Sequence, residues 1–221
     1  MESFAEGSIR RNLFFVVLPP GWRYFPARYR TAGFPGFTEI TRCEIVSAAS
    51  RYRSINTGDS ESTFYLEASM SLASMFAAGI ARGLPSARVW AFSGDGAFAM
   101  NPGMLMVERE MALPNMTHFL VSNRVYGATS NGPVPNRADN NYAGMARAAG
   151  LENVYEFETL SELEGGLADV LRRNGPTFVV LEVEPLESPA VSPPIDGPEL
   201  KFRFGRHIER TFGVEVFTDR V

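Results

Sequence analysis

Residues 89–98 read VWAFSGDGAF, an apolar run of four residues followed by a short turn with two glycines. The apolar run predicts a strand that is buried on both faces, and the glycines predict a tight turn directly after it. A helix is expected next, because Asn101-Pro102 combines a capping residue with proline at the first helical position. The stretch therefore predicts a strand–turn–helix unit whose helix runs from Asn101 to about Ala112.

The same alternation of strand and helix continues on both sides of this unit. Other apolar segments predict further strands at 54–57, 118–122, 154–157 and 178–183. Capping signals and helical periodicity predict helices at 39–51, 68–83, 141–149, 161–173 and 199–211, two of them opened by the boxes Thr41-Arg42-Cys43-Glu44 and Ser161-Glu162-Leu163-Glu164. This order predicts the α/β class, with a doubly wound parallel sheet and helices on both faces.

The chain of 221 residues has the length of one domain with an extension. Residues 1–37 are rich in aromatic residues, arginine, proline and glycine without a clear period, and we expect an arm that packs on a surface. Residues 38–221 are expected to form the domain. Within it, a proline-rich linker at 185–198 precedes the C-terminal helix.

Composition excludes several kinds of chemistry. The 21 basic residues include one lysine, Lys201, which lies outside any P-loop pattern. One cysteine and two histidines exclude an internal disulfide, a zinc ribbon and a cysteine-ligated cluster within this chain. The net charge of −4 argues against nucleic-acid binding, and no apolar run approaches the length needed to span a bilayer. We therefore expect a cytoplasmic protein without a nucleic-acid or membrane partner.

The candidate site lies where two predicted strands end. Asp95 follows the strand 89–92, and Asn123 follows the strand 118–122, 28 residues later. One strand–helix–strand unit spans that distance, so both side chains are expected at the carboxyl edge of the sheet. Ligands of open parallel sheets bind at this edge.

Three interpretations of this turn compete. Gly94-x-Gly96-x-x-Ala99 matches a dinucleotide fingerprint, but Asp95 would then face an anionic pyrophosphate, and Asn123 stands where an acidic residue is wanted. A magnesium–diphosphate site fits better, because carboxylate, amide and backbone carbonyl oxygens suit Mg²⁺. The third interpretation is a structural turn in which the aspartate bonds its own backbone. We favour the magnesium–diphosphate site.

Gly94-Asp95-Gly96, followed after 26 residues by Asn123, resembles the motif of thiamine diphosphate enzymes. Residues 64–74 resemble the segment before the buried helix of sulfopyruvate and phosphonopyruvate decarboxylases. The family's Gly-Ser-Met-Gly stands there as Ala68-Ser69-Met70-Ser71, so two glycines are replaced.

The resemblance extends over roughly residues 40–215. Asn56-Thr57-Gly58 is similar to an earlier cofactor loop, and residues 125–129 are similar to the segment after the metal asparagine. The next segment, Asn131-Gly132-Pro133, replaces the usual Gly-Gly-Gln-Pro, so the family's substrate preference does not transfer. Residues 1–37 have no counterpart.

The resemblance implies a thiamine diphosphate- and Mg²⁺-dependent decarboxylase of a small 2-oxo acid. Alternatives are a carboligase or oxidoreductase subunit on the same cofactor, or a non-catalytic regulatory paralogue. By the family pattern, Asp95, Asn123 and the carbonyl of Val125 bind the metal. The cofactor-binding residues implied are Gly94, Asp95, Gly96, Ala97, Asn123, Val125, Tyr126, Ser69 and Met70.

The resemblance covers a diphosphate-binding β-type subunit only. It implies a separate pyrimidine-binding α-type subunit, which carries the activating glutamate, in an α₂β₂ or larger assembly. The methionine-rich stretch 68–80 and the arm 1–37 are expected to contact that partner. His118 is expected to pack within a strand. Arg124 and Arg137 flank the site and are candidates either for an anionic substrate tail or for surface ion pairs.

Overall fold

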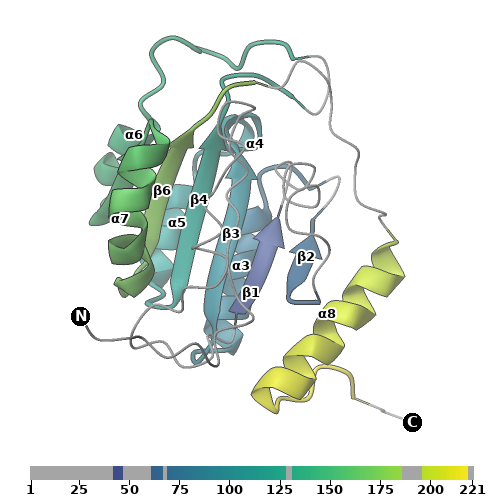
Figure 1. The fold of residues 1–221 in the computed structure, drawn as a ribbon. Coiled ribbons are helices and arrows are strands. Elements are labelled where there is room, and N and C mark those ends of the chain that lie inside the picture. Colours follow the sequence, from purple (N-terminus) through teal and green to yellow (C-terminus); the bar gives the residue numbers. More distant parts are fainter. Residues whose placement is uncertain (1–41, 47–60, 67–68, 128–130, 186–195, 219–221) are drawn as a thin grey trace, which may run out of the picture.

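The computed structural model describes residues 42–46, 61–66, 69–127, 131–185 and 196–218. These residues form a six-stranded sheet and the helices packed against it (Figure 1). The strands are β1 (Arg42–Val46), β2 (Thr63–Tyr65), β3 (Arg88–Gly94), β4 (Met116–Ser122), β5 (Asn153–Phe157) and β6 (Thr177–Glu182). They lie in the order β2-β1-β3-β4-β6-β5, and every neighbouring pair is parallel. The order reverses between β1 and β3, and ligands of such sheets bind at that reversal.

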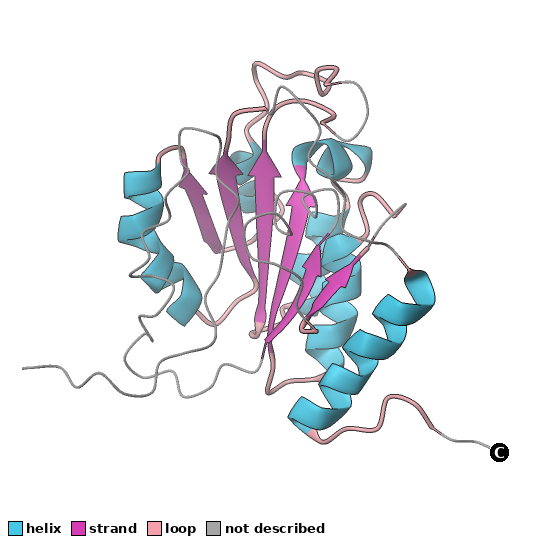
Figure 2. Cartoon of the chain, turned by 45° about the vertical axis from the view of Figure 1, so that its right-hand side comes forward, coloured by secondary structure: helices cyan, strands magenta, loops and turns pink. Residues whose placement is uncertain are grey.

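Helices pack on both faces of the sheet, as the sequence predicts (Figure 2). They are α3 (Ala73–Gly83), α4 (Asp95–Met100), α5 (Met104–Met111), α6 (Tyr142–Ala148), α7 (Leu160–Arg172) and α8 (Gly197–Phe212). On one face lie α3, α4, α5 and α6, and on the other lies α7. Helix α8 lies beside the β2 edge (Figure 1). The doubly wound α/β prediction is confirmed.

The core shows why the apolar runs form buried strands. Along β3, Val89 and Ala91 pack with α3, whereas Trp90 and Phe92 join the cluster that α7 covers. All four are at most 6% exposed. Successive side chains of a strand point to opposite faces, so a strand covered on both sides is apolar at most positions instead of at every second one.

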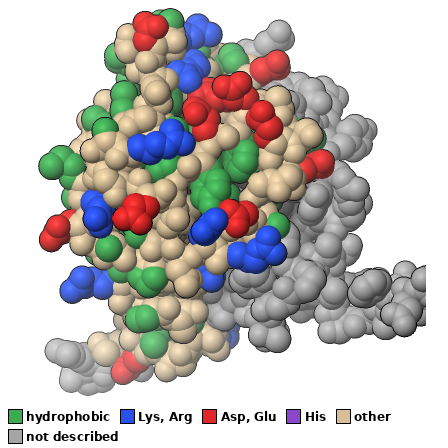
Figure 3. All heavy atoms as spheres, turned by 90° about the vertical axis from the view of Figure 1, so that its left-hand side faces the viewer, with side chains coloured by type: hydrophobic (Ala, Val, Ile, Leu, Met, Phe, Trp, Pro, Cys, Tyr) green, Lys and Arg blue, Asp and Glu red, His purple; other side chains and the backbone are tan. Residues whose placement is uncertain are grey.

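The surface of the α7 side carries both signs of charge. Figure 3 shows basic and acidic side chains interspersed over this face. Arg173 and Asp169, for example, form an ion pair with an N–O distance of 3.2 Å. Within the described residues, no helix is long and apolar enough to span a bilayer.

The helix predicted at 39–51 is wrong where the structure describes it, because Arg42–Val46 form strand β1. This strand pairs in parallel with β2 on one side and with β3 on the other. The four-residue capping signature reports only local preference, and hydrogen bonding to two neighbouring strands overrides it. Strand β2 was not predicted.

The turn after β3 also differs from the prediction. A short helix, α4, begins at Asp95 itself, with Gly94 as its N-cap residue, and Asn101 closes it. The next helix therefore starts at Met104 instead of Asn101. The Asn-Pro signal marks this junction between two helices, so the sequence shows the break but not the helix before it.

Other boundaries shift by a few residues. Helix α3 begins at Ala73, five residues after the predicted start, although its end at Gly83 is as predicted. The capping box of α7 is formed by Thr159 and Glu162, two residues before the one predicted. The predicted strand 54–57, the arm 1–37 and most of the linker 185–198 lie outside the described residues.

A buried polar network joins β3, β4 and α5. His118 Nε2 lies 2.6 Å from Ser93 Oγ, and His118 Nδ1 lies 2.9 Å from Glu108 Oε1. The serine, histidine and acid follow one another as in the catalytic triad of a hydrolase. All three residues are at most 2% exposed, however, so a substrate cannot reach them. The prediction that His118 is a packed histidine is confirmed. Such fully satisfied networks fix the relative position of the elements that carry them.

We expect Glu108→Ala to lower the free energy of unfolding by about 1–3 kcal/mol, because it leaves a buried histidine nitrogen without its partner. Glu110→Ala is the matched control, since Glu110 is exposed on the same helix and should change stability by less than about 0.5 kcal/mol. Urea unfolding of both variants measures the difference. Equal stability of the two variants would contradict a structural role for the network.

Candidate functional site

The carboxylate of Asp95 connects the carboxyl ends of β3 and β4. Its Oδ1 accepts a hydrogen bond from the Gly96 amide at 2.9 Å. Its Oδ2 accepts one from the Arg124 amide at 2.7 Å and one from the Ser122 hydroxyl at 3.3 Å. The structure thus brings the turn after β3 against the turn after β4, as the 28-residue spacing predicts.

Asp95 is 1% exposed, and burial raises its pKa from 3.8 to about 6 although the hydrogen bonds from Arg124, Gly96 and Ser122 lower it. A buried carboxylate with a raised pKa lacks a compensating positive charge. The site therefore fits a cation.

The donor set around Asp95 fits a hard cation. Among the described residues, no group of three or more His, Cys, Asp or Glu side chains surrounds a metal position. The predicted set is instead mixed, with one carboxylate, the amide oxygen of Asn123 and the carbonyl oxygen of Val125. Magnesium accepts such oxygens and fills its remaining positions with phosphate and water.

Asn123 and Val125 lie in a compact turn. Asn123 Oδ1 accepts the Val125 amide at 3.1 Å, and the Val125 carbonyl accepts the Gly127 amide at 3.0 Å. Each of these oxygens has a second lone pair, so one hydrogen bond does not exclude a metal bond.

The segment after this turn folds back along it. The Tyr126 amide donates a hydrogen bond to the Gly132 carbonyl at 2.8 Å, and Val125 forms an antiparallel β-bridge with Pro133. Val134, which is 2% exposed, donates to the Arg124 carbonyl at 3.3 Å. The replaced Asn131-Gly132-Pro133 segment therefore supports the backbone of the candidate metal site.

Gly96 allows Tyr126 to approach the start of α4. A Cβ atom on Gly96 would lie 2.7 Å from Tyr126 Cδ1, closer than real contacts allow. Gly94 caps α4 and Ala97 is 1% exposed within it. The predicted contacts of these residues with a diphosphate stay predictions.

Ser69 and Met70 lie just before α3, in a turn closed by a bond from the Leu72 amide to the Ser69 carbonyl. Ser71 has a φ of 74°, the left-handed region that favours glycine. Backbone conformation therefore accounts for a glycine at this position in the family pattern. A role of Ser69 and Met70 in cofactor binding stays a prediction.

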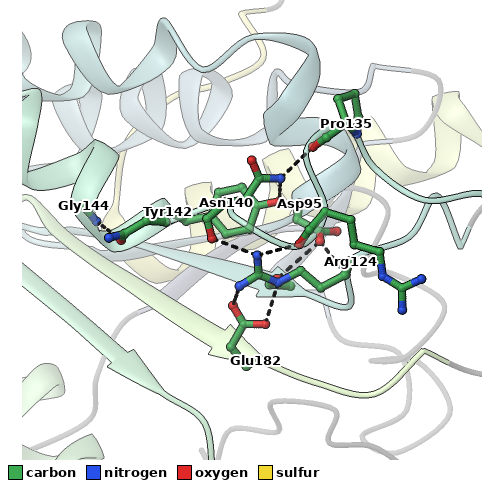
Figure 4. Close-up of polar contacts among 10 residues, drawn as sticks. Asp95, Arg124, Pro135, Asn140, Tyr142, Gly144 and Glu182 are labelled. Atoms are coloured by element: carbon green, nitrogen blue, oxygen red, sulfur yellow. Dashed lines mark hydrogen bonds and ion pairs between the residues drawn. The ribbon is translucent and has the colours of Figure 1, made fainter.

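The Arg124 side chain makes four hydrogen bonds within the chain (Figure 4). Its guanidinium forms two bonds with Glu182, Nε–Oε2 at 3.1 Å and Nη2–Oε1 at 2.5 Å. Nη1 donates to the carbonyls of Asn140 at 2.8 Å and Arg137 at 3.3 Å, and the group lies 5.1 Å from the Tyr142 ring centre. Of the two functions considered for Arg124, the structure shows the ion pair. The Arg137 side chain is exposed.

The sequence analysis missed Glu182, Asn140 and Tyr142. A signal for Glu182 was present, because an acidic residue at the carboxyl end of an apolar strand lies at the binding edge of the sheet. Asn140 lies just before α6 and Tyr142 begins it, and a helix start in the sequence carries no signal for a contact with Arg124. Tyr142 is 2% exposed, and burial raises its pKa to about 12.

Comparison with known families and sequences gives one consistent result. The family model described as "Thiamine pyrophosphate enzyme, C-terminal TPP binding domain" matches residues 44–181. The sulfopyruvate decarboxylase subunit beta of Methanocaldococcus jannaschii is 28% identical over 153 residues, 69% of this chain and 80% of that protein. Its namesake from Methanococcus maripaludis is 26% identical over 172 residues, 78% of this chain and 90% of that protein.

Solved structures share the fold. A protein of Mycobacterium smegmatis that is described as a thiamin diphosphate-dependent enzyme superposes with a TM-score of 0.55 and 18% identity over 67% of this chain. The thiamine diphosphate-dependent 4-hydroxybenzoylformate decarboxylase of Rhodococcus jostii RHA1 gives 0.57 and 16% over 83%. This chain spans about a third of each, 30% and 36% of their lengths.

The raised pKa of Asp95 predicts how the cofactor-free chain responds to pH. The Asp95 carboxyl binds its proton more tightly in the folded state than in the unfolded state, and this difference stabilises the fold. The contribution is complete below the ordinary pKa of 3.8 and is lost as the pH rises through the folded-state pKa of about 6. The shift corresponds to about 3 kcal/mol. Urea unfolding of wild type and Asp95→Ala from about pH 4 to 7 measures it. A stability difference between them that does not change with pH would contradict the prediction.

Proposed function

We infer the function from the family, since the chain belongs to the thiamine pyrophosphate enzymes and carries their C-terminal TPP-binding domain. We propose that it is the β-type subunit of a heteromeric 2-oxo acid decarboxylase related to sulfopyruvate decarboxylase. The observation that carries the proposal is the buried carboxylate of Asp95, which meets the turn Asn123–Val125 at the carboxyl edge of the sheet. The raised pKa of Asp95 supports a cation there.

The proposed cation is Mg²⁺, held by Asp95, Asn123 and the carbonyl of Val125. When bound, thiamine diphosphate supplies the nucleophilic carbon and the electron sink for decarboxylation. The chain itself holds the diphosphate end. In this proposal Gly94, Gly96 and Ala97 let the backbone approach the phosphates at the first turn of α4.

A pyrimidine-binding α-type partner is proposed to complete the site. In this proposal the chain binds the diphosphate end of the cofactor, and proton transfer at its ring needs a carboxylate from elsewhere. Large apolar side chains are exposed at the start of α3, at the end of α4 and on α5: Leu72 at 46%, Met100 at 61% and Met106 at 71%. In this proposal the partner covers these side chains. An α₂β₂ or larger assembly and a cytoplasmic location complete the proposal.

The first test is cofactor binding by the chain together with its partner. We expect Asp95→Ala to abolish Mg²⁺-dependent binding of thiamine diphosphate and Asn123→Ala to weaken it strongly, because each removes a metal ligand. Calorimetry measures both. Asp169→Ala is the control, since it removes a half-buried carboxylate of α7 that pairs with Arg173 outside the proposed site. Unchanged affinity in Asp95→Ala would refute the metal assignment.

The second test concerns assembly. The purified chain should show no decarboxylase activity alone and should gain it with the product of a neighbouring gene that encodes a pyrimidine-type domain. Size-exclusion chromatography and a carbon dioxide assay, with and without that product, measure the effect. Full turnover by the isolated chain would refute the two-subunit proposal.

A further inference from the structure

Arg124 has a backbone conformation that its residue type disfavours. Its φ is 62°, in the left-handed region that a residue with a Cβ enters at a cost of about 1–2 kcal/mol. It stands between the two proposed metal-binding positions Asn123 and Val125. Strained non-glycine residues persist only where surrounding contacts fix them. The contacts of Arg124 must therefore hold it in this conformation.

The backbone and the side chain of Arg124 bind different parts of the site. The amide donates to Asp95 Oδ2 at 2.7 Å, and the guanidinium binds Glu182 with both Nε and Nη2. The same side chain donates to the carbonyls of Arg137 and Asn140. One residue therefore links the turn after β4, the end of β6 and the segment before α6.

Glu182 is itself fixed in the sheet. It ends β6 and lies in register with Ser122 of β4, and the Val183 amide donates to the Ser122 carbonyl at 2.8 Å. The side chains of Arg124 and Glu182 are 24% and 20% exposed, so solvent screens this bidentate pair only in part. The carboxylate also raises the pKa of Arg124 further above its ordinary value.

We propose that Arg124 is a positioning residue that holds the turn Asn123–Val125 in its metal-binding conformation by acting through Glu182, and that it does not bind substrate. The inference rests on the proposed function, because the metal is part of that proposal. Pairing with Glu182 also neutralises the guanidinium, so a cation close to Asp95 can approach Arg124 with little repulsion.

Four variants separate the side chain from the backbone. Arg124→Gly removes the side chain but keeps the left-handed conformation accessible. Glu182→Gln removes the negative charge that pairs with Arg124. Arg124→Lys retains the positive charge without the bidentate geometry. Arg206→Ala is the matched control, because Arg206 also pairs with a glutamate, at 2.7 Å, and lies 5.3 Å from the ring centre of Phe217.

The first measurement is hydrogen exchange of the cofactor-free chain. Arg124→Gly and Glu182→Gln should both lose protection in residues 123–127 and 131–142, while Arg206→Ala should keep it. The readout needs neither metal nor activity. Wild-type protection of these residues in both site variants would overturn the proposal.

The second measurement is calorimetric binding of thiamine diphosphate and Mg²⁺ to the chain with its partner. Arg124→Gly and Glu182→Gln should each weaken Mg²⁺ binding by about 10- to 100-fold, the usual effect of losing a residue that orients a metal ligand. The double variant should be no weaker than the worse single one, because both act through the same pair. Arg124→Lys should recover part of the loss.

Kinetics distinguish positioning from substrate binding. At saturating Mg²⁺ and cofactor, Arg124→Gly should leave KM for an anionic 2-oxo acid within about twofold of wild type, because substrate does not contact the side chain. A large KM increase confined to the anionic substrate would overturn the proposal. Absence of Mg²⁺-dependent cofactor binding in the wild-type complex would instead overturn the proposed function itself.

Discussion

The buried carboxylate of Asp95 is the interaction on which the rest of the site depends. It follows the last residue of β3, begins α4 and accepts a hydrogen bond from the amide of Arg124 in the turn after β4. These bonds join the two turns at the carboxyl edge of the sheet, where Tyr126 also packs against Gly96. The cost is a charged group at 1% exposure whose pKa rises to about 6. A bound cation would remove that cost, so the fold and the proposed chemistry share one constraint.

Most of the fold follows from the sequence because each buried strand contains an uninterrupted run of apolar residues. The strands β3, β4 and β6 could be located to within a few residues in this way. Strand β1 could not, since the local signal at Thr41–Glu44 favours a helix and only pairing with two neighbouring strands decides for β. Helix α4 was missed for a related reason, as a helix of six residues between a glycine turn and Asn101 has too few positions to show a period.

The site could be predicted in part. The turn residues Asp95 and Asn123 are visible from their spacing, because one strand–helix–strand unit sets where the chain returns to the same edge. The pair Arg124–Glu182 is not visible, since its members are 58 positions apart and the strand order β4-β6-β5 brings them together. No local pattern distinguishes an arginine that binds a substrate from one that binds the end of a neighbouring strand. That distinction needs the tertiary structure.

Two buried acids in this domain illustrate what separates a structural group from a site. Glu108 lies against His118, which also binds Ser93, so its carboxylate is hydrogen-bonded to an imidazole ring inside the core. The described hydrogen-bond partners of Asp95 are two amides and one hydroxyl, all of them neutral. Neutral donors satisfy the oxygens but do not balance the charge, and burial therefore raises the pKa of Asp95. A buried carboxylate whose oxygens are hydrogen-bonded but whose negative charge is not balanced is the one that needs a positively charged ligand. Asp95 is such a carboxylate, and it lies at the edge where parallel sheets bind their ligands.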